Sequence, residues 1–245
     1  MKIELIDYTG AGSPDPARHA ANLLVFTKQT RLQMAPEGLK AIESWSQEQI
    51  EEQLNYMANT IPSSWEFVDY TFMINGVTRA FTHQLVRTRT GTYAQQTMRV
   101  LDVSGWDFST GPTIANSPDM DAFYKDSMSI IDLWYKSLIN QGAAIEDARG
   151  ILPTNIHTNI AAKFNLRNLS EMFRKRASSR TQGEYREVIE GMKAEVLRVH
   201  PWTDIFFSRT QAKAASELEA EILSLGLEKD HQTTLVKLVD QLRNS

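Results

Sequence analysis

The chain contains no cysteine among its 245 residues. This absence excludes disulfide bonds and zinc sites with thiolate ligands, and it leaves no thiolate that could attack a substrate. The chain also has no apolar run long enough to span a membrane, and its first ten residues, MKIELIDYTG, lack the profile of a signal peptide. We therefore expect a cytoplasmic protein with no membrane partner and no metal site.

Composition and length are those of an ordinary globular protein. Hydrophobic residues make up 42% and charged residues 23% of the chain, and 245 residues can bury the core of one or two domains. Strand-like and helix-like segments follow one another with no internal repeat and no low-complexity linker. We predict an α+β domain over residues 1–209, followed by a helical extension over residues 210–245.

Periodicity, turn residues and capping signals give approximate boundaries for the expected elements. The expected strands cover about residues 2–8, 66–74, 92–100 and 154–164. The expected helices cover about residues 17–32, 46–58, 76–87, 120–148, 166–177, 185–200, 212–225 and 233–242. Between them, residues 102–118 form a loop long enough to suggest a function.

A stretch without carboxylates occurs in a chain whose formal net charge is −4. Residues 84–99, QLVRTRTGTYAQQTMR, carry hydroxyl and amide side chains and three arginines: Arg87, Arg89 and Arg99. Guanidinium groups match phosphate and carboxylate groups in a two-pronged geometry, so the stretch indicates a phosphate-bearing ligand. The alternative is that these arginines form ion pairs with acids distant in the sequence, such as Glu51, Glu52 or Asp69.

The spacing of these residues resembles a known signature. Arg87-Thr88-Arg89 is followed by seven residues and then by Thr97-Met98-Arg99. The flavin-dependent thymidylate synthases have Arg-His-Arg, seven residues, Ser and an arginine two positions later. The chain therefore resembles this family, with Thr88 in place of the histidine and Thr97 in place of the serine.

A second block of the same family follows in the right order. It extends from Leu152 to Glu184 and matches in four groups: Leu152-Pro153, Asn165-Leu166-Arg167, Arg176-Ala177 and Gln182-Gly183-Glu184. Arg149, just upstream of Leu152, also matches. Two blocks in the right order make the resemblance specific, and together they cover roughly residues 61–202.

The resemblance implies a fold and a reaction. The fold is a central antiparallel sheet flanked by helices, and the assembly is a homotetramer whose FAD sites are shared between subunits. The reaction is the methylation of dUMP at C5 in dTMP biosynthesis, with methylenetetrahydrofolate as carbon donor, FAD as flavin and NADPH as its reductant. The absence of cysteine is compatible with this chemistry, because the classical thymidylate synthase attacks the uracil ring with a thiolate.

The resemblance also assigns the site residues. The expected nucleotide contacts are Gln84, Arg87, Gln95, Gln96, Thr97, Arg99, Arg149 and Arg176. The expected FAD contacts are Ser63, Arg87, Thr88, Arg89, Gln95, Asn165, Arg167 and Glu171. On a strand over 92–100, Gln95, Thr97 and Arg99 would point to one face.

Arg176 is the expected catalytic residue. Its guanidinium stays charged at any working pH, so it would stabilise negative charge on N3 and O4 of the pyrimidine and raise the electron density at C5. The structural alternative is that Arg176 is one of several cations near the end of a helix, where positive charge is favourable. Asn165 has a structural alternative as well, because an asparagine at a helix start is a common N-cap.

The departures from the family pattern lie mainly on the flavin and folate side. Thr88 and Ile61 stand where the family has histidines, Gln95 stands for a glutamate, and Glu171 stands for an asparagine or histidine. Other readings therefore stay open: a C5 methylase or hydroxymethylase of UMP or dCMP, or a non-catalytic relative that binds a nucleotide or RNA. Aromatic residues are sparse in the basic segment 163–186, so we expect no nucleic-acid partner.

Overall fold

The computed structural model describes residues 1–32, 38–176, 183–207, 218–226 and 229–244. The chain divides into two compact units. Unit 1 comprises Met1–Tyr8, Asp69–Phe164 and Ser179–Glu195, and unit 2 comprises Thr9–Val68, Asn165–Ser178 and Val196–Ser245. Each unit is therefore assembled from segments that are distant in the sequence.

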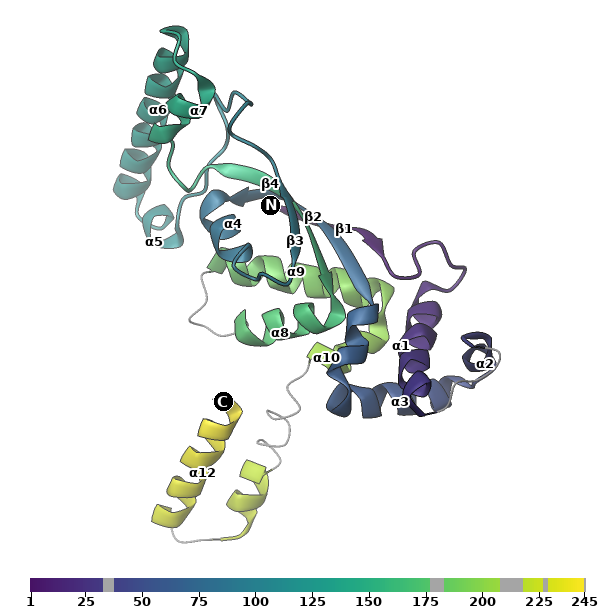
Figure 1. The fold of residues 1–245 in the computed structure, drawn as a ribbon. Coiled ribbons are helices and arrows are strands. Elements are labelled where there is room, and N and C mark those ends of the chain that lie inside the picture. The colour runs from purple at the N-terminus through teal and green to yellow at the C-terminus, as the bar shows by residue number, and fades with distance from the viewer. Residues whose placement is uncertain (33–37, 177–182, 208–217, 227–228, 245) are drawn as a thin grey trace. The chain divides into compact units, whose positions relative to one another are not determined.

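Unit 1 is built around a four-stranded antiparallel sheet with the strand order β1-β2-β4-β3 (Figure 1). The strands are β1 (Lys2–Tyr8), β2 (Asp69–Thr78), β3 (Thr92–Gln95) and β4 (His157–Asn165). Side chains of β2 and β4 alternate between buried and partly exposed, as a sheet with one face on the core requires. Tyr70, Phe72 and Ile74 of β2 are fully buried.

Two helices of unit 1 pack beside this sheet, α4 (Arg79–Leu85) and α9 (Gly183–Val199). Phe81 of α4 and Tyr185 of α9 place their ring centroids 5.2 Å apart. A Cβ atom on Gly191 would lie 2.3 Å from Cδ1 of Ile3, so α9 approaches β1 closely at a position without a side chain. The aromatic contact and the close approach hold α4, α9 and the sheet in one core.

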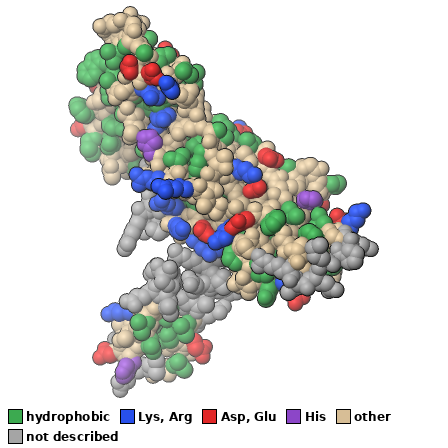
Figure 2. All heavy atoms as spheres, in the orientation of Figure 1, with side chains coloured by type: hydrophobic (Ala, Val, Ile, Leu, Met, Phe, Trp, Pro, Cys, Tyr) green, Lys and Arg blue, Asp and Glu red, His purple; other side chains and the backbone are tan. Residues whose placement is uncertain are grey.

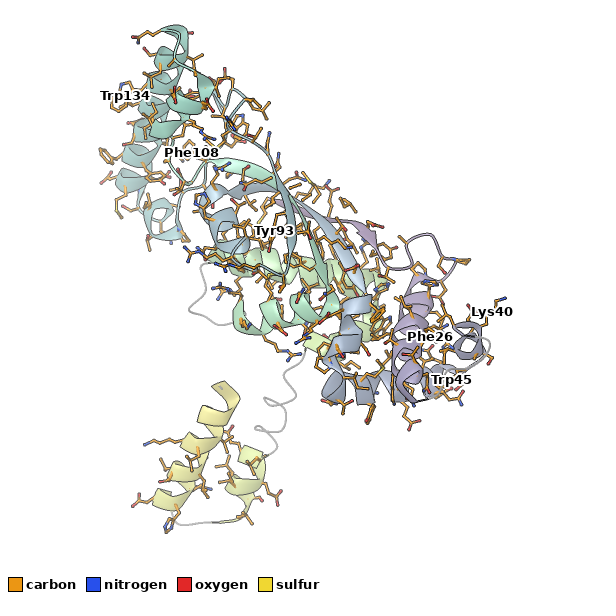
Figure 3. The ribbon with its side chains drawn as sticks, viewed as in Figure 1. Phe26, Lys40, Trp45, Tyr93, Phe108 and Trp134 are labelled. Carbon is orange, nitrogen blue, oxygen red and sulfur yellow. The ribbon has the colours of Figure 1, made fainter. Side chains whose placement is uncertain are left out.

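A second core of unit 1 forms away from the main part of the sheet. Its elements are α5 (Pro112–Ala115), α6 (Pro118–Asn140), α7 (Ile145–Ala148) and η2 (Arg149–Ile151). Met128 and Tyr135 of α6 pack there with Met98 and Ile156. Phe108, labelled in Figure 3, lies with its ring 6.3 Å from that of Tyr124.

Unit 2 is helical. Its elements are α1 (Pro16–Leu32), α2 (Lys40–Glu43), α3 (Gln47–Thr60), η1 (Pro62–Phe67), α8 (Leu166–Arg176), η3 (Pro201–Thr203), α10 (Asp204–Phe207) and α12 (Lys229–Asn244). Trp65 of η1 is buried, donates from Nε1 to the carbonyl of Met57 at 3.0 Å, and meets the ring of Phe206 edge-on at 4.9 Å. This tryptophan therefore joins three segments of unit 2.

Most of the expected elements are present, and the α+β class is confirmed. The strand over 2–8 and the helix from 17 to 32 are confirmed, and Ser46 and Gln49 form the expected capping box at the start of α3. The strand expected from 66 begins only at Asp69, because residues 62–67 form the 3₁₀ helix η1 that buries Trp65. The helix expected over 120–148 is two helices, separated at Gly142, which has φ +92°.

The expectation of a strand through residue 100 is wrong, because β3 ends at Gln95. Met98 turns into the second core, where it is 6% exposed, and the hydroxyl of Thr97 accepts the backbone N–H of Arg99 at 3.0 Å. A hydroxyl that bonds to the backbone two residues on offers the chain a turn in place of a ladder. Gln95, Thr97 and Arg99 therefore do not share one face of a strand.

The proposed boundary between residues 209 and 210 lies outside the described residues, as do residues 212–217 of one expected helix. Beyond them, Ile222 packs against Val236 and Val239 of α12. Among the described residues, none of the helices combines the length and the apolar composition needed to cross a bilayer.

Candidate functional site

The arginine motif lies in a turn after α4, and hydrogen bonds from the side chain of Tyr93 stabilise this turn. The hydroxyl of Tyr93 lies 2.7 Å from the carbonyl oxygen of Thr88 and 3.0 Å from that of Leu85, and donates its proton there. Burial raises the pKa of Tyr93 well above its usual value. A Cβ atom on Gly91 would lie 2.5 Å from both Tyr93 and Phe164. We name this arrangement of Tyr93, Leu85, Thr88, Gly91 and Phe164 the Tyr93 clamp.

Arg87 and Arg89, which flank Thr88 in this turn, are exposed. Within unit 1, neither side chain forms an ion pair among the described residues, and Asp69 is occupied by Lys163 at 3.0 Å. Figure 2 shows Lys and Arg side chains gathered over the end of α4. Two fixed cations without an acid nearby make this turn suitable for an anionic ligand.

Gln95 and Gln96 leave the sheet with their side chains already engaged. Gln95 donates from Nε2 to the hydroxyl of Thr82 on α4 at 3.0 Å, and Thr82 is fully buried. Nδ2 of Asn159 on β4 donates to the side-chain oxygen Oε1 of Gln96 at 3.0 Å. Both amides therefore keep further donor or acceptor atoms for a ligand while their orientation is set by the protein.

The structure brings Arg99 and Arg149 to the same residue, although they are far apart in the sequence. Arg99 donates from Nε to Oε2 of Glu146 at 2.7 Å, and Arg149 donates from Nε to the backbone carbonyl of Glu146 at 3.1 Å. Arg99 therefore does pair with a distant acid, as the structural alternative proposed, but with Glu146 and not with Glu51, Glu52 or Asp69. Nothing in the sequence pattern singled out Glu146.

Glu184, a motif residue without an assigned role, has a structural one. Its carboxylate accepts the backbone N–H of Thr78 at 2.7 Å and the hydroxyl of Thr78 at 2.6 Å. The Thr78 hydroxyl in turn accepts the backbone N–H of Phe81 at 3.0 Å and caps α4. The carboxylate thus directs the Thr78 proton away, so that the hydroxyl oxygen can act as the N-cap.

Three of the expected flavin contacts, Asn165, Arg167 and Glu171, lie in unit 2. The backbone N–H of Asn168 donates to Oδ1 of Asn165 at 2.9 Å. Asn165 therefore caps α8, as the structural alternative proposed. Arg167 donates to Glu66 at 2.7 Å from Nη1 and to Glu171 at 3.2 Å from Nε. These two carboxylates, Glu66 first, raise the pKa of Arg167.

Four further expected residues lie on α4, in the turn that follows it, on η1 and on α8. Gln84 is half-buried on α4, and Thr88 is half-buried in the following turn. Ser63 is exposed on η1, and Arg176 is the last residue of α8. The site assignments of these residues remain predictions.

Two cavities of unit 1 lie elsewhere. One of about 420 Å³ is bordered by residues 103–110 and α6, and one of about 470 Å³ contains a hydrogen bond of 2.8 Å between Ser109 and His157. Neither is lined by an expected site residue. We place the candidate site at the arginine turn, because Arg87 and Arg89 are exposed there beside amide and hydroxyl side chains and form no ion pair with the described residues of unit 1.

The antiparallel sheet with its helices and the arginine turn define an α+β enzyme equipped for anionic ligands. A family model described as "Thymidylate synthase complementing protein" matches residues 4–202. This match covers most of the chain, so the chain belongs to the family of flavin-dependent thymidylate synthases, as the motifs predicted.

Similar proteins carry the same name. A protein of Clostridium tetani named "Flavin-dependent thymidylate synthase" is 29% identical over 222 residues, which cover 82% of this chain and 84% of the relative. Proteins of that name from Nitratidesulfovibrio vulgaris and Pyrococcus furiosus are 37% and 38% identical, and each matched region covers 54% of this chain. These regions span 58% and 56% of the two relatives.

Proposed function

We propose that this protein methylates dUMP at C5 to give dTMP. In this reaction methylenetetrahydrofolate donates the carbon, FAD is the flavin, and NADPH reduces it. The observation that carries the proposal is the turn after α4, where Arg87 and Arg89 form no ion pair with any described residue of their unit. The family match and the names of the relatives support the same reaction.

The protein's own chemistry is consistent with a route that needs no thiolate. No cysteine is present, so no sulfur can add to C6 of the pyrimidine. The nucleotide must therefore be activated through its own ionisation. Arg176 is the proposed source of that activation, because a guanidinium can meet N3 and O4 together and stabilise the negative charge that develops there.

The residues proposed for the flavin fit a group that carries a diphosphate. Arg87 and Arg89 offer guanidinium donors, Thr88 lies between them, and Arg167 offers a third guanidinium held only by exposed carboxylates. A flavin bound there would supply the hydride that completes the methyl group. Ser63, Asn165 and Glu171 are proposed as further contacts to it, although Asn165 already caps α8 and Glu171 pairs with Arg167.

A single reconstitution tests the proposal. Purified protein is incubated with FAD, NADPH, methylenetetrahydrofolate and dUMP, and the product is identified by mass. We expect dTMP from the wild type and none from Arg176→Ala. Product from UMP or dCMP alone, or a hydroxymethyl product, would replace the dUMP assignment, and a flavin-free protein that turns over nothing would indicate a non-catalytic relative.

The expected homotetramer is also a proposal, and helix α6 supports it. One face of α6 packs on the second core through Met128 and Tyr135. The remaining surface exposes five large apolar side chains: Met120, Phe123, Ile130, Leu133 and Trp134. Trp134, labelled in Figure 3, is 62% exposed. A helix that is apolar on two faces is typical of a helix buried between two bodies, and we assign a second copy of this chain as the other body.

Light scattering tests this assignment. Phe123→Glu with Trp134→Glu should lower the particle mass without changing the helical circular dichroism. Asp126→Asn on the same helix is the matched control and should leave the mass unchanged. A double variant with the wild-type mass would exclude the α6 face as the interface.

A further inference from the structure

Arg79, the first residue of α4, is fixed close to the segment that carries Arg149. Its backbone N–H donates to the carbonyl of Ile156 at 3.1 Å, and the next N–H, of Ala80, donates to the carbonyl of Thr154 at 2.8 Å. Residues 154–156 follow η2, and η2 begins at Arg149. These two hydrogen bonds tie the start of α4 to the segment that follows Arg149 and η2.

The side chain of Arg79 is half-buried and lacks a partner for one of its nitrogens. Nη1 is enclosed by protein and has no hydrogen-bond acceptor among the described residues. Neither Arg79 nor Arg149 forms an ion pair in the part of the chain that the structure describes. An arginine cannot lose its proton to relieve this situation, and a buried charged donor without an acceptor is costly.

The two guanidiniums also repel one another. Burial first, and the positive charge of Arg149 second, lower the pKa of Arg79. Because neither cation forms an ion pair with the described residues, an anion of the ligand can compensate their charge.

Arg79 is also linked to two groups of the proposed nucleotide contacts. For the first group, Thr82 stands one helical turn after Arg79 and accepts the side-chain amide of Gln95 at 3.0 Å. For the second group, Arg149 and Arg99 meet at Glu146.

We propose that Arg79 is a further substrate-binding residue, which together with Arg149 receives a phosphate oxyanion of the nucleotide. This inference rests on the proposed function, because it takes the substrate to be a nucleoside monophosphate. It assigns to Arg79 a contact that none of the sequence motifs contains, since Arg79 lies five residues before the first motif residue, Gln84.

The test compares a ligand with and without its phosphate. Binding of dUMP and of deoxyuridine to the full-length protein is measured by calorimetry for the wild type, Arg79→Gln and Arg186→Gln. Arg186 is an exposed arginine of α9, so its variant loses the same charge away from the site. Arg79→Gln should weaken dUMP about 10- to 100-fold and leave deoxyuridine unchanged, and Arg186→Gln should change neither more than about twofold.

Three results would overturn the inference. These are dUMP affinity within about twofold of wild type in Arg79→Gln, an equal loss for dUMP and deoxyuridine, and a loss confined to FAD. Inorganic phosphate separates this inference from the proposed function. If phosphate raises the Tm of the wild type but not of Arg79→Gln while dUMP does not bind, the anion site stands and the dUMP assignment fails. A wild type that responds to neither probe refutes both.

Discussion

Arg87 and Arg89 of unit 1 and Arg167 of unit 2 belong to the same family signature, but their surroundings differ. The first two are exposed in a turn and form no ion pair with the described residues of their unit, whereas Arg167 contacts both Glu66 and Glu171. The carboxylates beside Arg167 are themselves 46% and 44% exposed. Unit 1 therefore presents uncompensated positive charge, while unit 2 presents positive charge that is already balanced.

The difference shows how the two units could divide their tasks. Uncompensated guanidiniums favour any phosphate that arrives, and they do so at the cost of repulsion in the empty protein. Balanced guanidiniums cost nothing in the empty protein, and exposed ion pairs are weak enough for a ligand to replace. We therefore expect binding of the nucleotide phosphate to depend on unit 1, and the flavin to compete with Glu66 for Arg167 in unit 2.

The largest expected effect concerns Arg176, the unit 2 cation assigned to the reaction. Arg176→Ala should lower kcat by about 10²- to 10³-fold, because it removes a charge placed against the developing anion. Arg176→Lys should recover little of the rate, since an ammonium lacks the planar fork. Steady-state kinetics with dUMP provides the measurement, and Arg186→Ala, at an exposed arginine of α9, is the control. A kcat for Arg176→Ala within a few-fold of wild type would reverse the assignment.

The second effect concerns acid stability, which should differ between the units. His200 of unit 2 is fully buried, and burial lowers its pKa from 6.5 to about 4, despite hydrogen bonds to the backbone of Pro16 and Thr9. A histidine whose folded pKa is depressed stabilises the fold above pH 6.5, and this contribution is lost as the pH falls toward 4. The loss amounts to about 3 kcal/mol.

Urea unfolding between pH 7 and pH 4 measures this loss. His200→Gln should flatten the pH dependence of the unfolding free energy, whatever its effect at pH 7. His83→Gln replaces an exposed histidine of unit 1 and should leave the pH dependence unchanged. An unaltered pH slope in His200→Gln would mean that another group carries the acid sensitivity.

The third effect tests the cap that orients the arginine turn. Glu184→Gln replaces a carboxylate that accepts two hydrogen bonds from Thr78 with a group that can accept only through one oxygen. We expect the free energy of unfolding to fall by about 2 kcal/mol. Glu187→Gln, an exposed position of the same helix, should change it by less than about 0.5 kcal/mol. Equal effects of the two variants would show that the hydrogen bonds between Glu184 and Thr78 do not stabilise the fold.

The smallest effect concerns the balanced arginine itself. Glu66→Gln removes one carboxylate from Arg167 and should change the free energy of unfolding by less than about 1 kcal/mol, because both groups are largely exposed. The same variant should tighten FAD binding slightly, since one competing acid is gone. A weaker affinity for FAD would show that Glu66 assists flavin binding. It would contradict the proposal that the flavin replaces Glu66 at Arg167.

Local signals predicted much of the fold, and contacts distant in sequence account for the misses. The strand at β1 and the capping box at Ser46 depend on neighbouring residues, so the sequence shows them directly. The end of β3 depends on the packing of Met98 against α6. The local sequence predicts a helix there, but it does not reveal that Met98 contacts that helix. The partner of Arg99 was missed for the same reason, because Glu146 comes close only once α7 is folded.

The Tyr93 clamp has a consequence for how fast and how tightly a ligand binds. Because one phenol fixes the carbonyls of Leu85 and Thr88, the arginine turn is ordered when the protein folds and not when the ligand arrives. Ordering a loop on binding weakens affinity, so an already ordered turn keeps more of its contact energy for the complex. Tyr93→Phe retains Arg87 and Arg89 but removes both hydrogen bonds that order their turn. The bound nucleotide should therefore dissociate faster from this variant than from the wild type.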